Sequence, residues 1–193
     1  MLTPSPFVQS KVSLRPARAP RFALERTLHW MGGVTNESYS RITGTIKELL
    51  RENQNEPITL MVTSPGGPTG VAMSFYDLMK NVYRPKLQTV GSGDVDSAGI
   101  ILFLTGAKRY LTPHTTMLLH LAGRTFESCR RFSTADMASI LKEDTLKDQH
   151  YASVVAECSG GRLTQERVLE LMAANTVLTA EEAVRYGLAQ QII

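Results

Sequence analysis

One serine lies where a nucleophile would be useful. Ser97 falls in the segment Gly93–Gly99, which follows a strand-like stretch and opens an apolar stretch typical of a helix. The N–H groups in the first turn of a helix have no partner within the helix and lie at the positive end of its dipole. They can hold a developing oxyanion while a neighbouring serine attacks a carbonyl. The alternative interpretation is that Asp96 or Ser97 simply caps the helix.

A glycine-rich turn precedes this serine in the chain. The residues Ser64-Pro65-Gly66-Gly67 close a short apolar strand and lead into a helix. Glycine lets the backbone adopt unusual conformations and approach a ligand closely, so N–H groups here can point at an anion or an incoming carbonyl. A tight turn with no binding role is the alternative.

A histidine ends a third strand-like segment. His120 follows the apolar run 116–119, and strand ends at one edge of a parallel sheet commonly converge on a site. An imidazole within hydrogen-bond reach of a serine can act as its general base. We interpret the other histidines, His29, His114 and His150, as structural or surface residues.

Strand-like and helix-like patterns alternate through the rest of the chain. Periodicity predicts strands over 22–31, 58–63, 86–91, 108–111 and 116–120, and helices over 36–51, 71–82, 96–106, 133–158, 164–174 and 179–186. Gly160-Gly161 would end the longest helix, and Thr179 begins a capping-box pattern. This alternation predicts an α/β fold with mostly parallel strands.

Composition excludes several classes of protein. The chain has 193 residues, of which 42% are apolar and 20% charged, and it contains no apolar run long enough to span a membrane. Residues 1–26 carry five basic groups and one acidic group, net +4, whereas the remaining 167 residues carry 16 basic and 17 acidic groups, net −1. The near-neutral net charge of these 167 residues argues against nucleic-acid binding through a broad basic face.

The N-terminal residues bear on domain organisation, and the cysteines bear on the cellular compartment. Four prolines in residues 1–21 predict an extended arm ahead of a single domain over 22–193. Two cysteines cannot form a disulfide scaffold, so we expect a reducing, cytoplasmic compartment. The spacing of cysteines and histidines argues against a structural zinc site, and no cofactor is predicted.

The order of these motifs resembles the proteolytic subunit of the Clp protease. Ser64-Pro65-Gly66-Gly67 is followed by Ser97, by Gly106-Ala107-Lys108 and Leu111-Thr112-Pro113, and then by His120. Tyr76-Asp77-Leu78-Met79 and the C-terminal stretch 178–188 fit as well, so the resemblance runs from about residue 25 to the C-terminus. It implies a crotonase/ClpP-like superhelix of repeated strand-strand-helix units with a long handle helix.

The resemblance also implies a mechanism and an assembly. Ser97 takes the position of the nucleophile, His120 that of the general base, and the N–H groups of Gly67 and Ala98 form the oxyanion hole. Residues 121–159 correspond to the handle, which in the family joins two heptameric rings into a tetradecamer that an AAA+ unfoldase supplies with protein or peptide substrates. Apolar subsite walls would include Val71, Met73 and Ile100.

Four features depart from the family pattern. The third triad position holds Asn175 instead of aspartate, and Asp96 stands where a small apolar residue is usual. An N-cap is our preferred interpretation of Asp96, and a carboxylate that compensates for Asn175 is the alternative. Residues 121–126 replace the family's usual Gln-Pro and glycine-rich strand, and the arm lacks the usual tyrosine-containing axial-loop sequence.

Other functions compete with a serine endopeptidase. A weakly active or inactive ring subunit that assembles with an active paralogue would explain Asn175 and Asp96. A Ser–Lys peptidase would use Lys142 or Lys147, although salt bridges with the helical neighbours Glu143, Asp144 and Asp148 explain these lysines better. An acyl-CoA enzyme of the crotonase type shares the fold but needs no serine nucleophile.

Overall fold

The structure is a computed structural model and describes residues 20–126 and 131–193. The predicted N-terminal arm therefore lies almost entirely outside the described residues. A short 3-10 turn, Leu24–Arg26, leads into the first strand. That strand begins at Thr27, later than the sequence predicts, because the residues before it pair with no neighbouring strand.

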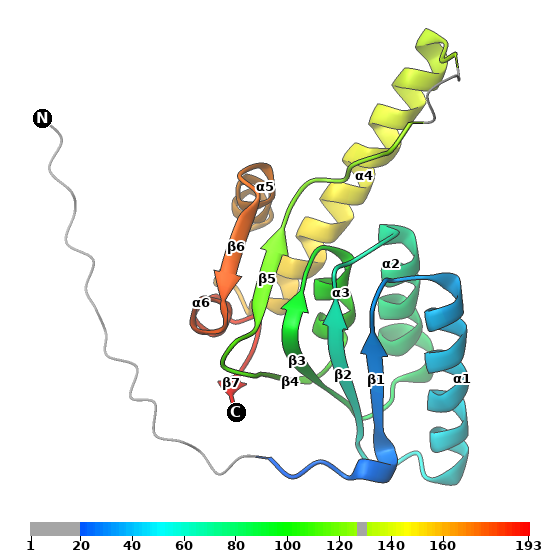
Figure 1. The fold of residues 1–193 in the computed structure, drawn as a ribbon, viewed down its shortest axis with the longest axis vertical. Coiled ribbons are helices and arrows are strands. Elements are labelled where there is room, and N and C mark those ends of the chain that lie inside the picture. The colour runs from blue at the N-terminus through cyan, green and yellow to red at the C-terminus, as the bar shows by residue number, and fades with distance from the viewer. Residues whose placement is uncertain (1–19, 127–130) are drawn as a thin grey trace, which may run out of the picture.

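A parallel sheet forms the centre of the molecule (Figure 1). Its strands are β1 (Thr27–Met31), β2 (Ile58–Ser64), β3 (Leu87–Val95), β4 (Lys108–Leu111) and β7 (Gln191–Ile192), in the order β1-β2-β3-β4-β7. Every neighbouring pair in this order is parallel. Five of the seven residues of β2 are buried, as expected for a strand inside a parallel sheet. The predicted α/β class with mostly parallel strands is confirmed.

Three helices pack beside this sheet. They are α1 (Asn36–Glu52), α2 (Thr69–Asp77), which a π-helical turn over Leu78–Tyr83 extends, and α3 (Ala98–Leu104). Thr35 begins α1 with a capping box, and the apolar face of α1 is buried. Every residue of α3 is buried, so the helix that follows Ser97 lies inside the core. Ser97 itself is half-buried at the start of this buried helix.

A second, smaller sheet lies beside the C-terminal helices. Strand β5 (Thr116–Leu119) pairs in parallel with β3 at Asp94 and antiparallel with β6 (Thr176–Thr179). Helices α5 (Gln165–Ala173) and α6 (Ala180–Arg185) flank β6. Strands β6 and β7 are absent from the sequence predictions, because each is short and forms only by pairing with a distant strand.

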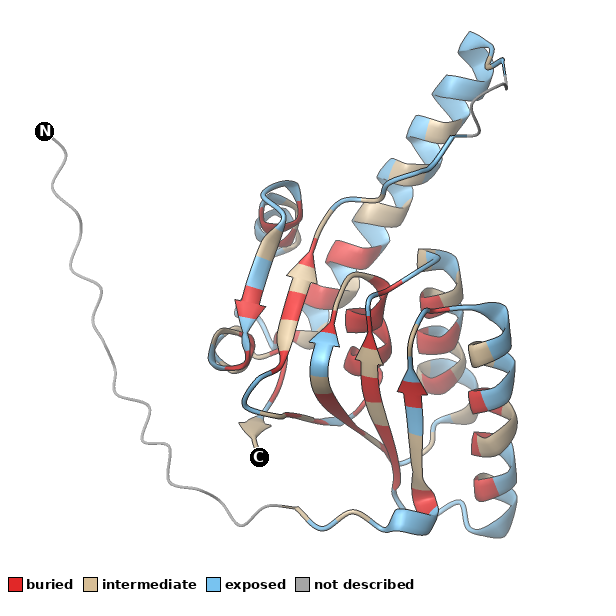
Figure 2. Cartoon of the chain, in the orientation of Figure 1, coloured by how far each residue is buried: buried red, intermediate tan, exposed pale blue. Residues whose placement is uncertain are grey.

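The longest helix, α4 (Thr134–Cys158), projects from the body of the molecule (Figure 1). Its outer half is largely exposed, whereas Tyr151, Ala152 and Val155 near its C-terminus are buried against the body (Figure 2). A capping box at Ser133 begins the helix, close to the predicted start. No helix in the described part of the chain has both the length and the apolar character needed to cross a membrane.

Candidate active site

Ser97 lies in a strained turn between β3 and α3. Its backbone has φ 54° and ψ −127°, a conformation that residues other than glycine rarely adopt. Ser97 N–H donates to the carbonyl of Leu118 over 2.8 Å, and its own carbonyl accepts from the Tyr151 hydroxyl over 3.0 Å. Such a conformation costs about 1–3 kcal/mol and persists only where surrounding contacts determine it. A strained turn from strand to helix is the way in which hydrolases expose a nucleophilic serine.

The glycine-rich turn packs directly against Ser97. Gly66 has φ +96°, and a Cβ atom there would lie 2.7 Å from the Cβ of Ser97. Gly67 has φ +149°, and a Cβ atom there would lie 2.5 Å from the carbonyl oxygen of Val34. Both glycines are therefore required by their backbone conformation and by the close approach of neighbouring atoms.

Two backbone N–H groups lie close to the serine. Among the described residues, the Gly67 N–H group has no hydrogen-bond acceptor. Ala98 is the first residue of α3, where the N–H group has no partner inside the helix. Neither N–H group has an acceptor among the described residues.

A cleft of about 350 Å³ opens beside Ser97. Gly67, Ser97 and His120 contribute to its lining from the β2–α2 loop, the β3–α3 turn and the end of β5. Residues 122–124 after His120, part of α4 and Met172 of α5 complete the walls. The structure thus brings three sequence-predicted site residues into one cleft.

His120 is half-buried at the end of β5. Its Nδ1 atom lies 2.7 Å from the carbonyl oxygen of Leu121. A carbonyl only accepts, so Nδ1 carries the proton and Nε2 is left free to accept one. Ser97 and His120 line the same cleft without a hydrogen bond between them, as is common in hydrolase sites that hold no substrate.

Asn175 lies outside this arrangement. It is exposed, has φ 49°, and does not line the cleft. Its backbone N–H donates to the carbonyl of Met172, whereas its side chain makes no hydrogen bond to any described residue. The structure therefore does not bring Asn175 into contact with His120.

Asp96 does not cap α3. The N-cap residue is Ser97, and its side chain makes no capping hydrogen bond. The Asp96 carboxylate instead accepts from the backbone N–H of Leu118 in β5, over 2.8 Å. Burial raises the pKa of Asp96, while that hydrogen bond and the charge of His120 act in the opposite direction. The N-cap interpretation was wrong because the turn directs this side chain toward β5.

A family comparison agrees with this geometry. A model of the Clp protease family matches residues 18–193. The chain belongs to the Clp protease family. The match includes every candidate site residue, confirms the resemblance drawn from the motifs, and supports a Clp-type peptidase in general. Clp proteases generally form oligomeric rings that work with Clp ATPases.

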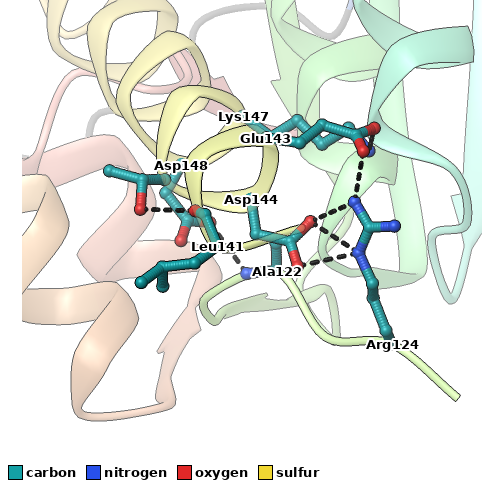
Figure 3. Close-up of polar contacts among 8 residues, drawn as sticks. Ala122, Arg124, Leu141, Glu143, Asp144, Lys147 and Asp148 are labelled. Atoms are coloured by element: carbon teal, nitrogen blue, oxygen red, sulfur yellow. Dashed lines mark hydrogen bonds and ion pairs between the residues drawn. The ribbon is translucent and has the colours of Figure 1, made fainter. Parts of the chain in front are cut away.

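In this Clp-family chain an ion-pair network ties the segment after His120 to α4 (Figure 3). Arg124 pairs with both Glu143 and Asp144, and Lys147 pairs with Glu143. Lys147 and Arg124 hold the pKa of Glu143 down to about 2. Lys147 lines the cleft, but its ammonium group is already engaged with the Glu143 carboxylate, which makes it a poor candidate for a general base.

Sequence reasoning missed much of the cleft's lining. Val71, Met73 and Ile100 do not line it, and Ile100 is completely buried. Asp144, Asp148 and Tyr151 do line it. Their spacing of four and three residues places them on one helical face, which the sequence does show. Nothing in the sequence indicates that this face turns toward Ser97.

Proposed function

We propose that this Clp-family chain is a serine endopeptidase that cleaves unfolded proteins or peptides. The observation that carries the proposal is the positive-φ turn at Ser97, held by contacts from two other elements and opening into the cleft that His120 and Gly67 also line. A protein has little reason to maintain such strain at a serine unless the serine is used.

The proposed reaction follows from these positions. Nε2 of His120 accepts the Ser97 hydroxyl proton as Oγ bonds to the peptide carbonyl carbon, and the N–H groups of Gly67 and Ala98 bind the oxyanion. His120 then gives the proton to the leaving amine as the C–N bond breaks. Each oxyanion donor contributes about 10²–10³ in rate in comparable hydrolases.

Asn175 is assigned to the third triad position only because it lies four residues before Thr179, as the family pattern requires. A side-chain amide there could orient His120 through its oxygen, but it would supply no charge for the imidazolium. Its exposed position and its lack of side-chain hydrogen bonds to described residues mean that our proposal rests on Ser97 and His120.

Intact-mass detection of a fluorophosphonate adduct tests the proposal. We expect a stoichiometric adduct that is lost in Ser97→Ala and His120→Ala. Ser74→Ala is the matched control, because Ser74 lies on α2 away from the cleft. An adduct that persists in Ser97→Ala, or no adduct in the assembled wild type, would reject Ser97 as an activated nucleophile.

A second candidate function is a catalytically weak or inactive ring subunit. The exposed position of Asn175 favours it, because the family's third triad position then contributes nothing to His120. Mixing the chain with an active Clp peptidase and following peptide cleavage separates the candidates. A structural subunit would change the partner's activity equally with Ser97 or with Ser97→Ala.

Assembly into two stacked heptameric rings, served by an AAA+ unfoldase in the cytoplasm, completes the proposal. The outer part of α4 supports a handle role, since Met137, Leu141 and Leu146 are 48%, 70% and 42% exposed. Apolar side chains on a projecting helix gain free energy when a second subunit covers them. Native mass spectrometry would give the number of subunits directly.

A further inference from the structure

Two carboxylates hold the backbone on either side of His120. The N–H group of Leu118, two residues before it, donates to Oδ1 of Asp96 over 2.8 Å. The N–H group of Ala122, two residues after it, donates to Oδ1 of Asp148 over 2.7 Å. The two aspartates come from different elements, the β3–α3 turn and α4. His120 thus lies between two anchored points of the backbone, one in β5 and one just after it.

Both carboxylates interact electrostatically with His120. Burial raises the pKa of Asp96 and of Asp148, and in each case a positive charge on His120 acts to lower it. Neither aspartate forms a salt bridge with a described lysine or arginine, whereas Asp144 in the same cleft is paired with Arg124. No described lysine or arginine neutralises these two carboxylates, so their negative charge can act on His120.

We propose that Asp96 and Asp148 act together as positioning residues for His120, fixing the end of β5 and stabilising the imidazolium in place of a triad aspartate. The inference rests on the proposed function, because the imidazolium forms when Ser97 gives up its proton. It explains how the protonated form of His120 can be stabilised although Asn175 lies outside the cleft. The two residues share the task from the chain segments before and after His120.

The other ionisable groups around His120 do not replace this pair. Those in the cleft or at the adjoining end of β3 are Asp94, Arg124, Asp144, Lys147 and Tyr151. Arg124, Asp144 and Lys147 belong to the ion-pair network, and burial raises the pKa of the Tyr151 hydroxyl and so favours its neutral form. Asp94 is exposed, so solvent screens its charge.

Isosteric substitutions separate charge from anchoring. Asp96→Asn and Asp148→Asn each keep an oxygen that can accept the same backbone N–H group, but each removes the negative charge. Glu170→Gln is the matched control, because it removes a carboxylate from an exposed ion pair with Arg167 on α5. The double variant Asp96→Asn/Asp148→Asn tests whether the two residues act independently.

The first readout needs no catalytic activity. Diethyl pyrocarbonate modifies neutral imidazole, so the rate of His120 modification against pH, followed by peptide mass spectrometry, gives a midpoint for protonation. A nearby negative charge favours the protonated form, so we expect each single variant to move this midpoint to lower pH by about 0.3–1 unit. The double variant should move it by roughly the sum, while His114 in the same samples and His120 in Glu170→Gln should not change.

The second readout is the pH profile of kcat/KM. We expect its acid limb to move in the same direction, with a plateau about three- to thirtyfold lower in each single variant. Unchanged modification midpoints in both single variants would overturn the inference, even if activity fell, because anchoring alone would then explain the loss. Failure of the proposed function shows itself separately, as the absence of a fluorophosphonate adduct on wild-type Ser97.

Discussion

The conformation of Ser97 depends on the glycine that faces it. A Cβ atom on Gly66 would lie 2.7 Å from the Cβ of Ser97 and 3.1 Å from its Oγ. Real Cβ atoms do not approach other atoms so closely, so any other residue would displace the turn that presents the hydroxyl. The glycine at this position therefore serves the serine's geometry, whatever its N–H group does.

Gly66→Ala should reduce fluorophosphonate labelling of Ser97 by at least about tenfold and destabilise the fold by about 1–3 kcal/mol, because of the clash and the positive φ. Gly70→Ala is the matched control, since nothing lies within 4 Å of its Cβ position in α2. There alanine should leave labelling unchanged and raise stability slightly. Equal labelling in the two variants would show that the turn tolerates displacement.

Asn175→Asp tests the third triad position directly. Because Asn175 is exposed and makes no side-chain hydrogen bond to a described residue, we expect kcat/KM for a peptide to change by less than about threefold. Both residues tolerate a left-handed backbone, so the fold should be unaffected. A gain of tenfold or more would place residue 175 beside His120 during catalysis.

At the scale of elements, the site depends on how α4 is joined to the segment that follows His120. Arg124 and Lys147 bring three carboxylate–cation contacts to the face of α4 that lines the cleft (Figure 3). Asp148 adds a hydrogen bond to the backbone of the same segment. Helix α4 therefore forms part of the cleft as well as projecting from the molecule.

The ion pairs of Glu143 with Arg124 and Lys147 should weaken in acid. The folded-state pKa of Glu143 is about 2, below its ordinary value of 4.5, so its contribution is present above pH 4.5 and is lost as the pH falls toward 2. Urea unfolding at pH 5 and at pH 3 should therefore show a larger loss of stability in wild type than in Glu143→Gln. Glu48→Gln, on the exposed face of α1, should lose as much as wild type. Identical losses in all three proteins would contradict the prediction.

At the scale of the whole molecule, the outer half of α4 leaves apolar side chains exposed. Leu141 is 70% exposed on the outer half of α4, which extends away from the body (Figure 2). Exposed apolar surface does not stabilise an isolated subunit. If a second subunit covered this surface, its burial would contribute about 25 cal/mol per Å² to the free energy of association. Assembly is thus the natural use of this part of the chain.

Leu141→Glu should reduce the assembly to a smaller particle in sedimentation velocity while leaving the circular dichroism spectrum of the subunit unchanged. The reason is that four glutamates and aspartates already lie near this position on α4, so a further charge repels a facing helix without disturbing the subunit core. Val82→Glu, an exposed apolar residue beyond α2, is the control for added charge. An unchanged sedimentation coefficient for Leu141→Glu would remove the outer half of α4 from the interface.

Local patterns were sufficient for most of the fold. The alternation of strands and helices, the capping box at Thr179 and the long helix ending before Gly160-Gly161 depend on residues close together in the chain. Strands β6 and β7 escaped prediction, because a four-residue and a two-residue strand exist only through pairing with β5 and β4. Such pairing has no local signal.

The sequence by itself determined the family and the glycine-rich turn before α2, and it indicated Ser97 and His120 as site candidates, because spacing and residue type along one chain carry that information. Only the tertiary structure decided that Asp96 binds β5, that Asp148 joins the cleft and that Asn175 does not. The aspartates meet their backbone partners across 22 and 26 residues of chain. Contacts of that kind depend on how α3, α4 and β5 dock on one another, and docking is set by the burial of the whole core.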